Sequence, residues 1–495
     1  MSITNDHIYS SIVIGAGFGG LGQGAQFVQE GVEDFLILER GDDVGGVWRE
    51  NTYPGAACDT QALVYCYSYF LNLKVSRLFA GQEELQGYLR SMVEEFGLGK
   101  HIRFGQNITA TEWDQDRRLW TVHTADGSQF LARSVVAAWG QLNVPNIPDI
   151  PGIGSFEGEV FHSSSWRHDL DLTGKRVASI GSAATAVQYV PEVAKIASNL
   201  TVFQRSANYI LPRDQYVFTA EETAAFLADP ELYLTKRQEI HELREAGFER
   251  TRRHSAASEE GVQQARQHLE SQVADPALRA KLTPDYDFGC KRILRSDDFY
   301  PTLTRDNVDL VTEKITEYTP RGIRTADGVE HEFDVIVYAT GFKSHAFQGS
   351  MRVAGRDGLR LDERWGNAPE AYLGITVDSF PNLFMVYGPN TNLNHNSVVS
   401  MLEAQHRYIA QAVEYIAADE TRVLEVDRGV LDDFNTHVQQ ELDKSAFSSE
   451  CSSWYKNEEG RVINNWSGTV NEYRTHTQDL QLEDYLQLAA AGSGK

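Results

Sequence analysis

Two short apolar runs, each ending in a glycine-marked turn and continuing at helical spacing, predict an α/β protein. A strand, a tight turn and a helix form the unit of dinucleotide-binding (Rossmann-like) domains, so we expect two such domains, each three-layered. Residues 214–288 are rich in Ala, Glu, Gln, Leu and Arg with little β-branching, which predicts a helical insertion in the second domain.

Size and charge limit the possible functions. The chain has 495 residues, of which 41% are hydrophobic, and this exceeds what one core supports and indicates two or three packed domains. A formal net charge of -25 repels nucleic acid and anionic lipid, so we expect no nucleic-acid partner. Any basic site must then be local, which makes isolated Arg and Lys side chains informative.

The sequence shows no membrane or metal signal. No apolar run reaches membrane-spanning length, and the N-terminal residues pass directly into the first expected strand without room for a signal peptide. We therefore expect a cytoplasmic monomer or homodimer with no membrane partner. The four cysteines, Cys58, Cys66, Cys290 and Cys451, form neither a C-x-x-C pair nor a ligand spacing. We expect reduced structural thiols and no metal.

The first glycine motif lies in SIVIGAGFGG, with Gly15, Gly17 and Gly20 in the G-x-G-x-x-G spacing. The chain turns at Gly15, a pyrophosphate approaches the backbone at Gly17, and Gly20 lets the helix pack against the strand. The phosphates would then face the helix N-terminus. The next expected strand, DFLILER, ends in Glu39, whose carboxylate would hold a ribose hydroxyl. A glycine-rich turn without a ligand is the alternative.

The second unit begins at GKRVASIGSAATAVQYVPEVA, where residues 177–180 form the expected strand and Gly181 opens the turn. Alanines replace the later glycines, so this turn by itself fits an ordinary βα connection as well as a dinucleotide site. The strand LTVFQR aligns with FLILER and puts Gln204 in the place of Glu39, followed by Arg205. Without the carboxylate, nothing repels a 2′-phosphate, and the guanidinium would bind it. A solvated surface charge is the alternative for Arg205.

These patterns assign FAD to the first site and NADPH to the second, with hydride passing from NADPH to flavin. The turn residues expected to bind NADPH are Gly181, Ser182 and Thr185. Disulfide reduction is excluded, because that chemistry needs a redox cysteine pair beside the flavin and none lies near the first motif.

The stretch FEGEVFHSSSWRH resembles the fingerprint F-x-G-x-x-x-H-x-x-x-W-P/D of Baeyer-Villiger monooxygenases, which are class B flavin monooxygenases. The matching residues are Phe156, Gly158, His162 and Trp166, and Arg167 stands where the family has Pro or Asp. Related flavin-containing and N-hydroxylating monooxygenases lack this Trp, so Trp166 favours the Baeyer-Villiger branch. The resemblance covers nearly the whole chain.

Three further segments carry the same resemblance. In DVGGVWRENTYPGAACDTQALVYCYSY, the family's flavin-facing glycines and Trp correspond to Gly45, Gly46 and Trp48, and its active-site Asp to Asp59. In FGCKRILRSDDFYPTLTRDNVDLV, the resemblance implies that Lys291 touches the NADP phosphate and that Arg292 is catalytic. FDVIVYATGFK, Phe333–Lys343, is similar to the A-T-G motif that closes the nicotinamide domain, whereas Trp139 replaces the usual Thr in the first copy.

The chemistry of Asp59 and Arg292 can also be argued from the residue types. A fixed guanidinium beside the flavin stabilises a peroxide anion and the tetrahedral oxyanion that follows, and Arg stays charged. A carboxylate behind it would hold its orientation. The alternatives are a turn-capping Asp and a surface salt bridge.

His162 and Trp166 precede the second nucleotide strand, between the domains. We expect them to set the interdomain crossing and to couple domain motion to cofactor state. An acid/base role for His162 is the alternative, although a lone His among aromatic residues is more often a packing residue.

The expected division of the chain places the FAD-binding domain in residues 1–147 and 368–495. The NADP-binding domain then covers residues 152–367, with the helical insertion, residues 214–288, inside it and capping the substrate route.

The resemblance implies that NADPH reduces FAD, that O2 forms a C4a-peroxyflavin, and that its anion attacks a ketone to give an ester or lactone. Heteroatom oxygenation of a sulfide or amine by the flavin hydroperoxide is the alternative, but it needs no oxyanion-stabilising Arg. A third possibility is a flavin-fold binding or electron-transfer module that oxygenates nothing.

Overall fold

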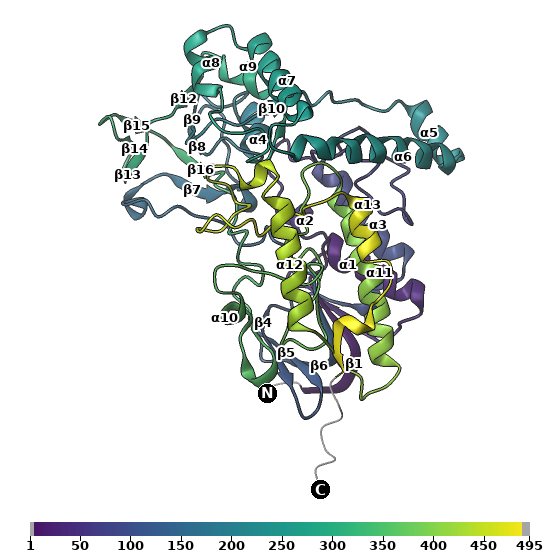
Figure 1. Ribbon diagram of the computed structural model, residues 1–495. Helices are drawn as coiled ribbons and strands as arrows, with labels where there is room; N and C mark the ends of the chain where they lie inside the picture. The colour runs from purple at the N-terminus through teal and green to yellow at the C-terminus, as the bar shows by residue number, and fades with distance from the viewer. Residues whose placement is uncertain (1–3, 488–495) are drawn as a thin grey trace.

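The computed structural model describes residues 4–487 and places them around two main sheets (Figure 1). The larger sheet has the order β17-β4-β5-β6-β1-β2-β3, and β18 also pairs with β6. Its strands are β1 (Thr4–Ile14), β2 (Phe35–Leu38), β3 (Ile102–Arg103), β4 (Ile108–Asp114), β5 (Leu119–Thr124), β6 (Gln129–Ala137), β17 (Arg352–Ala354) and β18 (Leu383–Met385). The strands β6, β1, β2 and β3 run parallel, whereas β4, β5 and β6 are joined antiparallel.

Both faces of this sheet are buried. Val13 of β1 belongs to one hydrophobic core, and its neighbours Ile12 and Ile14 belong to another, because successive side chains of a strand point to opposite faces. Helices cover the first face: α1 (Phe18–Glu30), α2 (Val47–Glu50), α3 (Gln82–Glu95), α11 (Val398–Ala417) and α12 (Arg428–Leu442). The helix α13 (Val470–His476) packs against α11 in a separate core. The other face packs against α10 (Leu361–Trp365) and the chain around it. β19 (Leu424–Val426) and β20 (Tyr485–Gln487) form a separate antiparallel pair.

The smaller sheet is entirely parallel, with the order β12-β9-β8-β16-β7. Its strands are β7 (Glu159–His162), β8 (Arg176–Ile180), β9 (Asn199–Phe203), β12 (Val308–Val311) and β16 (Val335–Tyr338). One face packs against α4 (Ala186–Val193) and α9 (Phe299–Leu303). The other face packs against the antiparallel strands β13 (Ile315–Thr319), β14 (Gly322–Thr325) and β15 (Glu330–Glu332). The predicted fold class, two nucleotide-binding units of three layers, is confirmed.

The predicted helical insertion is also confirmed. Its helices are α5 (Ala220–Ala228), α6 (Pro230–Ala246), the 3-10 helix η4 (Gly247–Thr251), α7 (Ala256–Gln272) and α8 (Pro276–Leu282). Phe226 and Tyr233 pack into the core of the larger sheet, whereas Leu269 and Leu282 pack into the core of the smaller one. The insertion therefore contacts both halves of the molecule, and Figure 1 shows α5 and α6 extending to one side.

Two short strands bring the ends of the insertion together. β10 (Ile210–Leu211) pairs in parallel with β11 (Leu294–Arg295). Ile210 and Leu294 of this pair pack into the core of the smaller sheet, so the segment before β11, which carries Lys291 and Arg292, is positioned beside that sheet.

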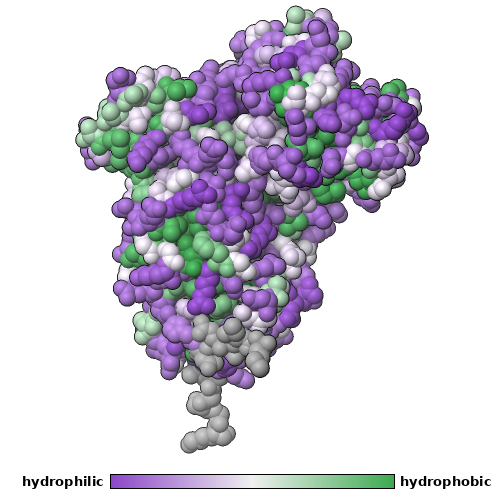
Figure 2. Space-filling view, turned by 180° about the vertical axis from the view of Figure 1, so that it is seen from behind, coloured by the Kyte–Doolittle hydropathy of each residue, from purple (hydrophilic) through white to green (hydrophobic). Residues whose placement is uncertain are grey.

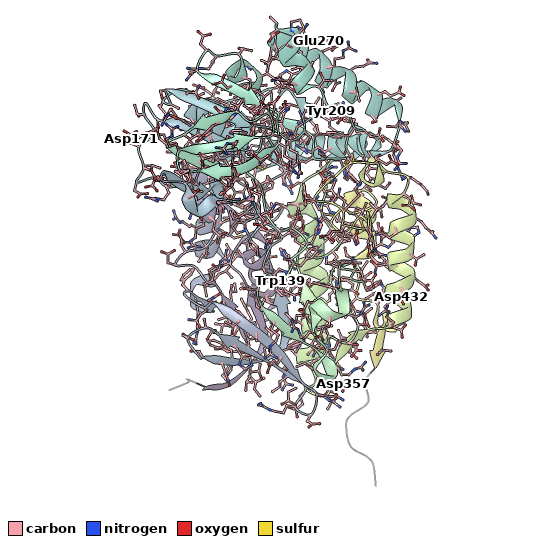
Figure 3. All side chains as sticks on the ribbon, turned by 90° about the vertical axis from the view of Figure 1, so that its left-hand side faces the viewer. Trp139, Asp171, Tyr209, Glu270, Asp357 and Asp432 are labelled. Atoms are coloured by element: carbon pink, nitrogen blue, oxygen red, sulfur yellow. A yellow bond between two sulfur atoms is a disulfide. The ribbon has the colours of Figure 1, made fainter. Side chains whose placement is uncertain are left out.

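The chain returns to the larger sheet earlier than the expected domain boundary. β17 begins at Arg352 and pairs with β4, whereas the FAD-binding domain was expected to resume at residue 368. Trp139, which follows β6 where the chain leaves the larger sheet, lies between the two main sheets in Figure 3. The domain boundaries themselves stay a prediction.

The expectation of four reduced cysteines is wrong for one pair. Cys290 and Cys451 form a disulfide, with their Cα atoms 6.4 Å apart, while Cys58 and Cys66 are free and buried. The two cysteines are 161 positions apart in the chain, so no local cysteine spacing predicts the disulfide. The disulfide links the Lys291–Arg292 segment to the C-terminal part of the chain.

The surface is mostly hydrophilic, with scattered hydrophobic patches on the face shown in Figure 2. Across residues 4–487 we find no helix with both the length and the apolar character that crossing a membrane requires.

We predict opposite effects of two Gly→Ala substitutions in helices. A Cβ at Gly20 would overlap the carbonyl oxygen of Gly15, so Gly20→Ala should lower the thermal unfolding temperature, as expected from an overpacking cost of about 1–3 kcal/mol. Gly87 lies inside α3 with open space around its Cβ position, so Gly87→Ala should add about 0.5–1 kcal/mol of stability. Differential scanning calorimetry measures both, and equal unfolding temperatures for the two variants would contradict the packing seen at Gly20.

Candidate active site

Two glycine turns face each other at the first nucleotide site. A Cβ at Gly17 would lie 3.4 Å from the Cα of Gly46, and one at Gly46 would lie 3.0 Å from the Cα of Gly17. Gly15, Gly45 and Gly46 all have positive φ, at 102°, 129° and 54°. Bare backbone therefore lines this place at the start of α1, which is what the close approach of a pyrophosphate requires.

Glu39 is held beside that turn by backbone hydrogen bonds. The N–H of Ala16 donates to its carboxylate over 2.8 Å, and the N–H of Gly41 donates over 2.7 Å. The side chain lies at the end of β2 and is buried. A carboxylate fixed next to a bare glycine turn fits the ribose and pyrophosphate of FAD.

Trp48 lies on the short helix α2, directly after the second glycine turn. Its indole N–H donates to the hydroxyl of Tyr65 over 3.3 Å, and the two rings meet edge to face. These contacts fix the indole where the sequence resemblance places a flavin-facing Trp.

The second nucleotide turn repeats the geometry of the first. A Cβ at Gly181 would lie 2.5 Å from the carbonyl oxygen of Ala339, just as one at Gly15 would lie 2.6 Å from that of Ala138. In each unit, the first glycine of the turn is therefore in close contact with the carbonyl oxygen of the alanine that begins an A-x-G segment. Ser182 and Thr185 follow Gly181 at the start of α4, and Thr185 is the N-cap of that helix.

Arg205 and Lys291 lie close together at the end of β9. Lys291 donates to the hydroxyl of Ser206 over 2.7 Å and lies 4.4 Å from the ring centre of Tyr286. Burial, and then the charge of Arg205, lowers the pKa of Lys291. Within residues 4–487 neither cation has a carboxylate within ion-pair distance. Two adjacent cations that are not engaged in an ion pair fit the 2′-phosphate of NADPH.

The absence of a carboxylate at the end of β9 is also visible. Gln204 is buried and donates through its amide to the carbonyl oxygen of Lys281 over 2.8 Å. This neutral side chain stands where β2 carries Glu39, so it does not repel a phosphate.

Asp59 and Arg292 lie 233 residues apart in the chain and form an ion pair. The Nη2 atom of Arg292 lies 2.7 Å from both carboxylate oxygens of Asp59, and its Nε donates over 3.0 Å. About 30% of each side chain remains accessible, 29% for Asp59 and 32% for Arg292. The guanidinium is therefore oriented by the carboxylate and still open to a small molecule.

Electrostatics keep both partners charged. Burial alone would raise the pKa of Asp59, but the charge and hydrogen bonds of Arg292 outweigh it and hold that pKa below its ordinary value. The charge of Asp59 raises the pKa of Arg292 above its ordinary value. Since the pKa of Asp59 is lowered, the pair persists as pH falls until that carboxylate is protonated.

The sequence and fold have close relatives. A family model described as flavin-binding monooxygenase-like matches residues 10–219. A Baeyer-Villiger monooxygenase of Streptomyces coelicolor is 39% identical over 481 residues, which cover 97% of this chain and 92% of the relative. One of Pseudomonas aeruginosa is 39% identical over 479 residues, covering 96% and 90%.

Solved structures agree with these relatives. The closed crystal structure of cyclohexanone monooxygenase superposes with a TM-score of 0.86 at 28% identity, covering 97% of both chains. The oxidised steroid monooxygenase bound to NADP gives a TM-score of 0.85 at 31% identity, covering 95% of this chain and 97% of the other. The chain belongs to the Baeyer-Villiger monooxygenase family. It is an NADPH-dependent flavoprotein monooxygenase whose cofactors are FAD and NADPH.

The fingerprint of this Baeyer-Villiger monooxygenase lies at the crossing between the two sheets. His162 ends β7 and donates through Nε2 to the carbonyl oxygen of Gly341 over 3.0 Å. The N–H of Asn146 donates to the same oxygen over 2.9 Å. His162, and the chain that leaves the larger sheet, therefore contact the same point of the segment that follows β16. Burial lowers the pKa of His162, which favours the neutral ring.

The other fingerprint residues pack or face solvent. Trp166 lies 5.2 Å from Phe161 and 5.3 Å from Tyr189, measured between ring centres. Phe156 is buried in the core under the smaller sheet, and a Cβ at Gly158 would lie 2.6 Å from the Phe156 ring. Arg167 forms exposed ion pairs with nearby carboxylates. Among the described residues, none of these side chains hydrogen-bonds to Asp59 or Arg292.

Several residues near the ion pair were missed by the sequence analysis of this Baeyer-Villiger monooxygenase. Tyr387 and Tyr455 lie near Arg292 and contribute to raising its pKa. Their hydroxyls donate to Asn392 and Asn394, in the loop before α11, over 2.7 and 2.6 Å. The repeated asparagines in NTNLNHN were the available signal. Arg213, Arg244 and Arg295 also lie at this end of the site, and no pattern marks them.

We predict that Arg205 and Lys291 set coenzyme preference. Arg205→Ala or Lys291→Ala should raise the KM for NADPH about ten- to hundredfold, as expected for one lost charge-assisted contact, with a much smaller effect on NADH. Steady-state kinetics with both coenzymes measures this. Lys195→Ala, which removes an exposed pair with Glu192, is the control and should leave both KM values unchanged. Equal losses for NADPH and NADH would contradict the phosphate assignment.

Proposed function

We propose that this monooxygenase inserts one oxygen atom next to a ketone carbonyl to give an ester or lactone. The ion pair between Asp59 and Arg292 carries the proposal, because a guanidinium fixed in orientation yet partly accessible is suited to an oxygen that becomes negative during the reaction. The names of the relatives and of the solved structures support the same reaction.

The overall reaction balances as ketone, O2, NADPH and a proton giving ester, water and NADP+. One oxygen atom enters the ester, and the other leaves as water. Bound FAD supplies the redox chemistry, since it takes hydride from NADPH and reacts with O2. The chain holds FAD through Gly15, Gly17, Gly20, Glu39, Gly46 and Trp48 and holds NADPH through Gly181, Ser182, Thr185, Arg205 and Lys291 in this proposal.

Arg292 acts on the oxygen atoms of the reaction. When the ketone carbon is attacked, its carbonyl oxygen gains negative charge, and hydrogen bonds from the Arg292 guanidinium stabilise that charge more than they stabilise the neutral ketone. The raised pKa of Arg292 means that it cannot give up its proton in this step. Asp59 accepts hydrogen bonds from Nε and Nη2 of Arg292 and so orients the remaining N–H groups toward the substrate in this proposal.

Heteroatom oxygenation is the second candidate function. Attack by a sulfide or amine leaves no oxyanion on the substrate, so a fixed Asp59–Arg292 pair would contribute little to it. The pair therefore favours the ketone reaction.

We further propose that residues 1–147 and 368–495 form an FAD-binding domain and that residues 152–367 form an NADP-binding domain. The pairing of β17 with β4 favours a return to the FAD-binding domain before residue 368. We also propose a cytoplasmic monomer or homodimer.

The reaction is tested with a panel of cyclic and linear ketones under ¹⁸O₂. Mass spectrometry should find one ¹⁸O atom in each ester and the other in water. Sulfoxides or N-oxides as the dominant products, with no ester from any ketone, would favour the second candidate.

We predict that Arg292→Ala retains FAD and oxidises NADPH in air but forms ester at least about a hundredfold more slowly, as expected when an oxyanion donor is lost. The consumed NADPH should appear as hydrogen peroxide. Arg292→Lys should recover part of the activity at most, because it keeps the charge and loses the planar fork. Asp59→Ala should be a milder form of Arg292→Ala.

Arg266→Ala removes only an exposed ion pair on α7 and serves as the control. Product chromatography beside a peroxide assay separates ester formation from uncoupled oxidation. Wild-type ester formation by Arg292→Ala would overturn the mechanism.

We predict a different defect for the fingerprint residues. His162→Ala and Trp166→Ala should keep FAD bound but slow flavin reduction or coupling several-fold, because the contacts at the interdomain crossing are lost. Stopped-flow spectra with NADPH measure the reduction step. Arg167→Ala, which loses only exposed ion pairs, should match wild type. Unchanged kinetics in every step for His162→Ala would mean that the stretch is only packing.

A further inference from the structure

Three arginines from distant parts of the chain donate to one short segment, residues 58–61. Arg292 binds the carboxylate of Asp59. Arg213 donates through Nη2 to the carbonyl oxygen of Cys58 over 3.4 Å. Arg244, from α6 of the helical insertion, donates through Nε to the side-chain oxygen of Gln61 over 2.5 Å. The segment therefore collects guanidinium groups from both halves of the molecule.

A fourth arginine adjoins this group. Arg295, in β11, donates through Nη1 to the carbonyl oxygen of Pro212, which directly precedes Arg213. The charges of Arg295 and Arg244 act on each other, and Arg250 acts on Arg295 in the same way. We call Arg213, Arg244 and Arg295 the cationic group.

Among the described residues the cationic group has no direct ion-pair partner, although Asp59 and Asp297 act on it electrostatically from a greater distance. In the part of the chain that the structure describes, none of its three guanidinium groups has a carboxylate oxygen within 4.0 Å, and Asp59 is already paired with Arg292. Nη2 of Arg244 has no hydrogen-bond acceptor among the described residues, and neither have Nε and Nη2 of Arg295. Several N–H groups thus remain available to a ligand.

The missing counter-ions are not explained by composition. The chain contains 70 Asp and Glu residues against 45 Lys and Arg. Each member of the group is partly buried, and burial lowers the pKa of Arg213 and Arg295 and lowers that of Arg244 to about 10. Keeping three such charges together without a carboxylate in ion-pair contact costs free energy, which an anionic ligand would offset.

The coenzyme phosphates have a separate place. Lys291 points to Ser206 and Tyr286, toward Arg205, whereas the next residue, Arg292, points to Asp59. The cationic group contacts the segment that carries Asp59, and not the surroundings of Lys291. Its N–H groups without an acceptor therefore belong to the side where we propose that the ketone reacts, and not to the side where we expect the 2′-phosphate.

We propose that Arg244 and Arg295, assisted by Arg213, form a carboxylate-binding site beside the Asp59–Arg292 pair, so that the preferred substrates are ketones that carry a carboxylate group. The planar guanidinium fork matches a carboxylate with two parallel hydrogen bonds. This specificity rests on the proposed ketone oxygenation at Arg292. It also gives the helical insertion a defined role, because α6 delivers Arg244 to the site.

Binding is tested first without turnover. The oxidised holoenzyme with FAD, saturated with NADP+, is titrated by calorimetry with butanoate, hexanoate and octanoate and with the corresponding amides. At least one carboxylate should bind about tenfold or more tightly than its amide, as expected for a charge-assisted pair. Equal affinities for every acid and its amide would overturn the proposal.

Turnover is then compared for 6-oxoheptanoate and its methyl ester. Arg244→Gln and Arg295→Gln should each lower kcat/KM for the keto acid about ten- to hundredfold and change that for the methyl ester less than about threefold. Arg244→Lys should fall between wild type and Arg244→Gln. Arg279→Gln is the matched control, since Arg279 also belongs to the insertion and donates only to carbonyl oxygens, those of Val273 and Ala274.

The two proposals fail in different ways. If both ketones consume NADPH and yield only hydrogen peroxide, ketone oxygenation fails, and the titration with carboxylates still decides on the anion site. If both are oxygenated with equal kcat/KM, the carboxylate preference is wrong while the reaction stands. If Arg244→Gln and Arg295→Gln weaken NADP+ binding and leave hexanoate binding unchanged, the cationic group serves the coenzyme phosphates and the proposal is overturned.

Discussion

The ion pair between Asp59 and Arg292 is the constraint on which the arrangement of the molecule depends. Asp59 follows the first nucleotide unit in the chain, and Arg292 directly precedes β11 of the second, 233 residues later. Two charges that are largely removed from water are tolerated only while they remain paired. The two sheets must therefore keep a relative position that is accurate to the length of a hydrogen bond. Contacts elsewhere along the chain serve this requirement.

The segment that carries Arg292 is held from more than one side. Cys290 is joined to Cys451, and the hydroxyl of Ser449 donates to the carboxylate of Asp287 over 2.6 Å. The C-terminal part of the chain thus holds the segment that carries the guanidinium. His162 adds a third restraint at the crossing, where the carbonyl oxygen of Gly341 accepts from it. A side chain that must be aimed within a fraction of an ångström needs such support from its neighbours.

The elements that repeat locally were predictable from the sequence, whereas contacts between distant segments were predictable only where a family resemblance brought the residues together, as it did for Asp59 and Arg292. Gly15 and Gly181 predict their turns because only glycine fits there, since a Cβ at either position would lie too close to a carbonyl oxygen. A single residue type therefore reveals the constraint. The helical insertion was predictable from composition alone. The Cys290–Cys451 disulfide was wrongly expected to be two thiols, because its partners meet only through the tertiary fold. Arg244 was missed for the same reason: on α6 it looks like any solvated helix residue, and only packing brings it to residue 61.

Charge balance explains why the surroundings of the pair matter for its chemistry. Asp59 and Arg292 together carry no net charge, so the pair alone orients N–H groups without giving the site a positive potential. A positive potential adds to the stabilisation that the aimed donors give to a developing oxyanion. In a chain with a formal net charge of -25, it must come from cations that lack counter-ions near the reacting oxygen. Arg244 and Arg295 meet this condition, since neither has a carboxylate within 4.0 Å in residues 4–487. The same surplus of positive charge that attracts an anionic substrate would therefore also lower the energy of the oxyanion at Arg292.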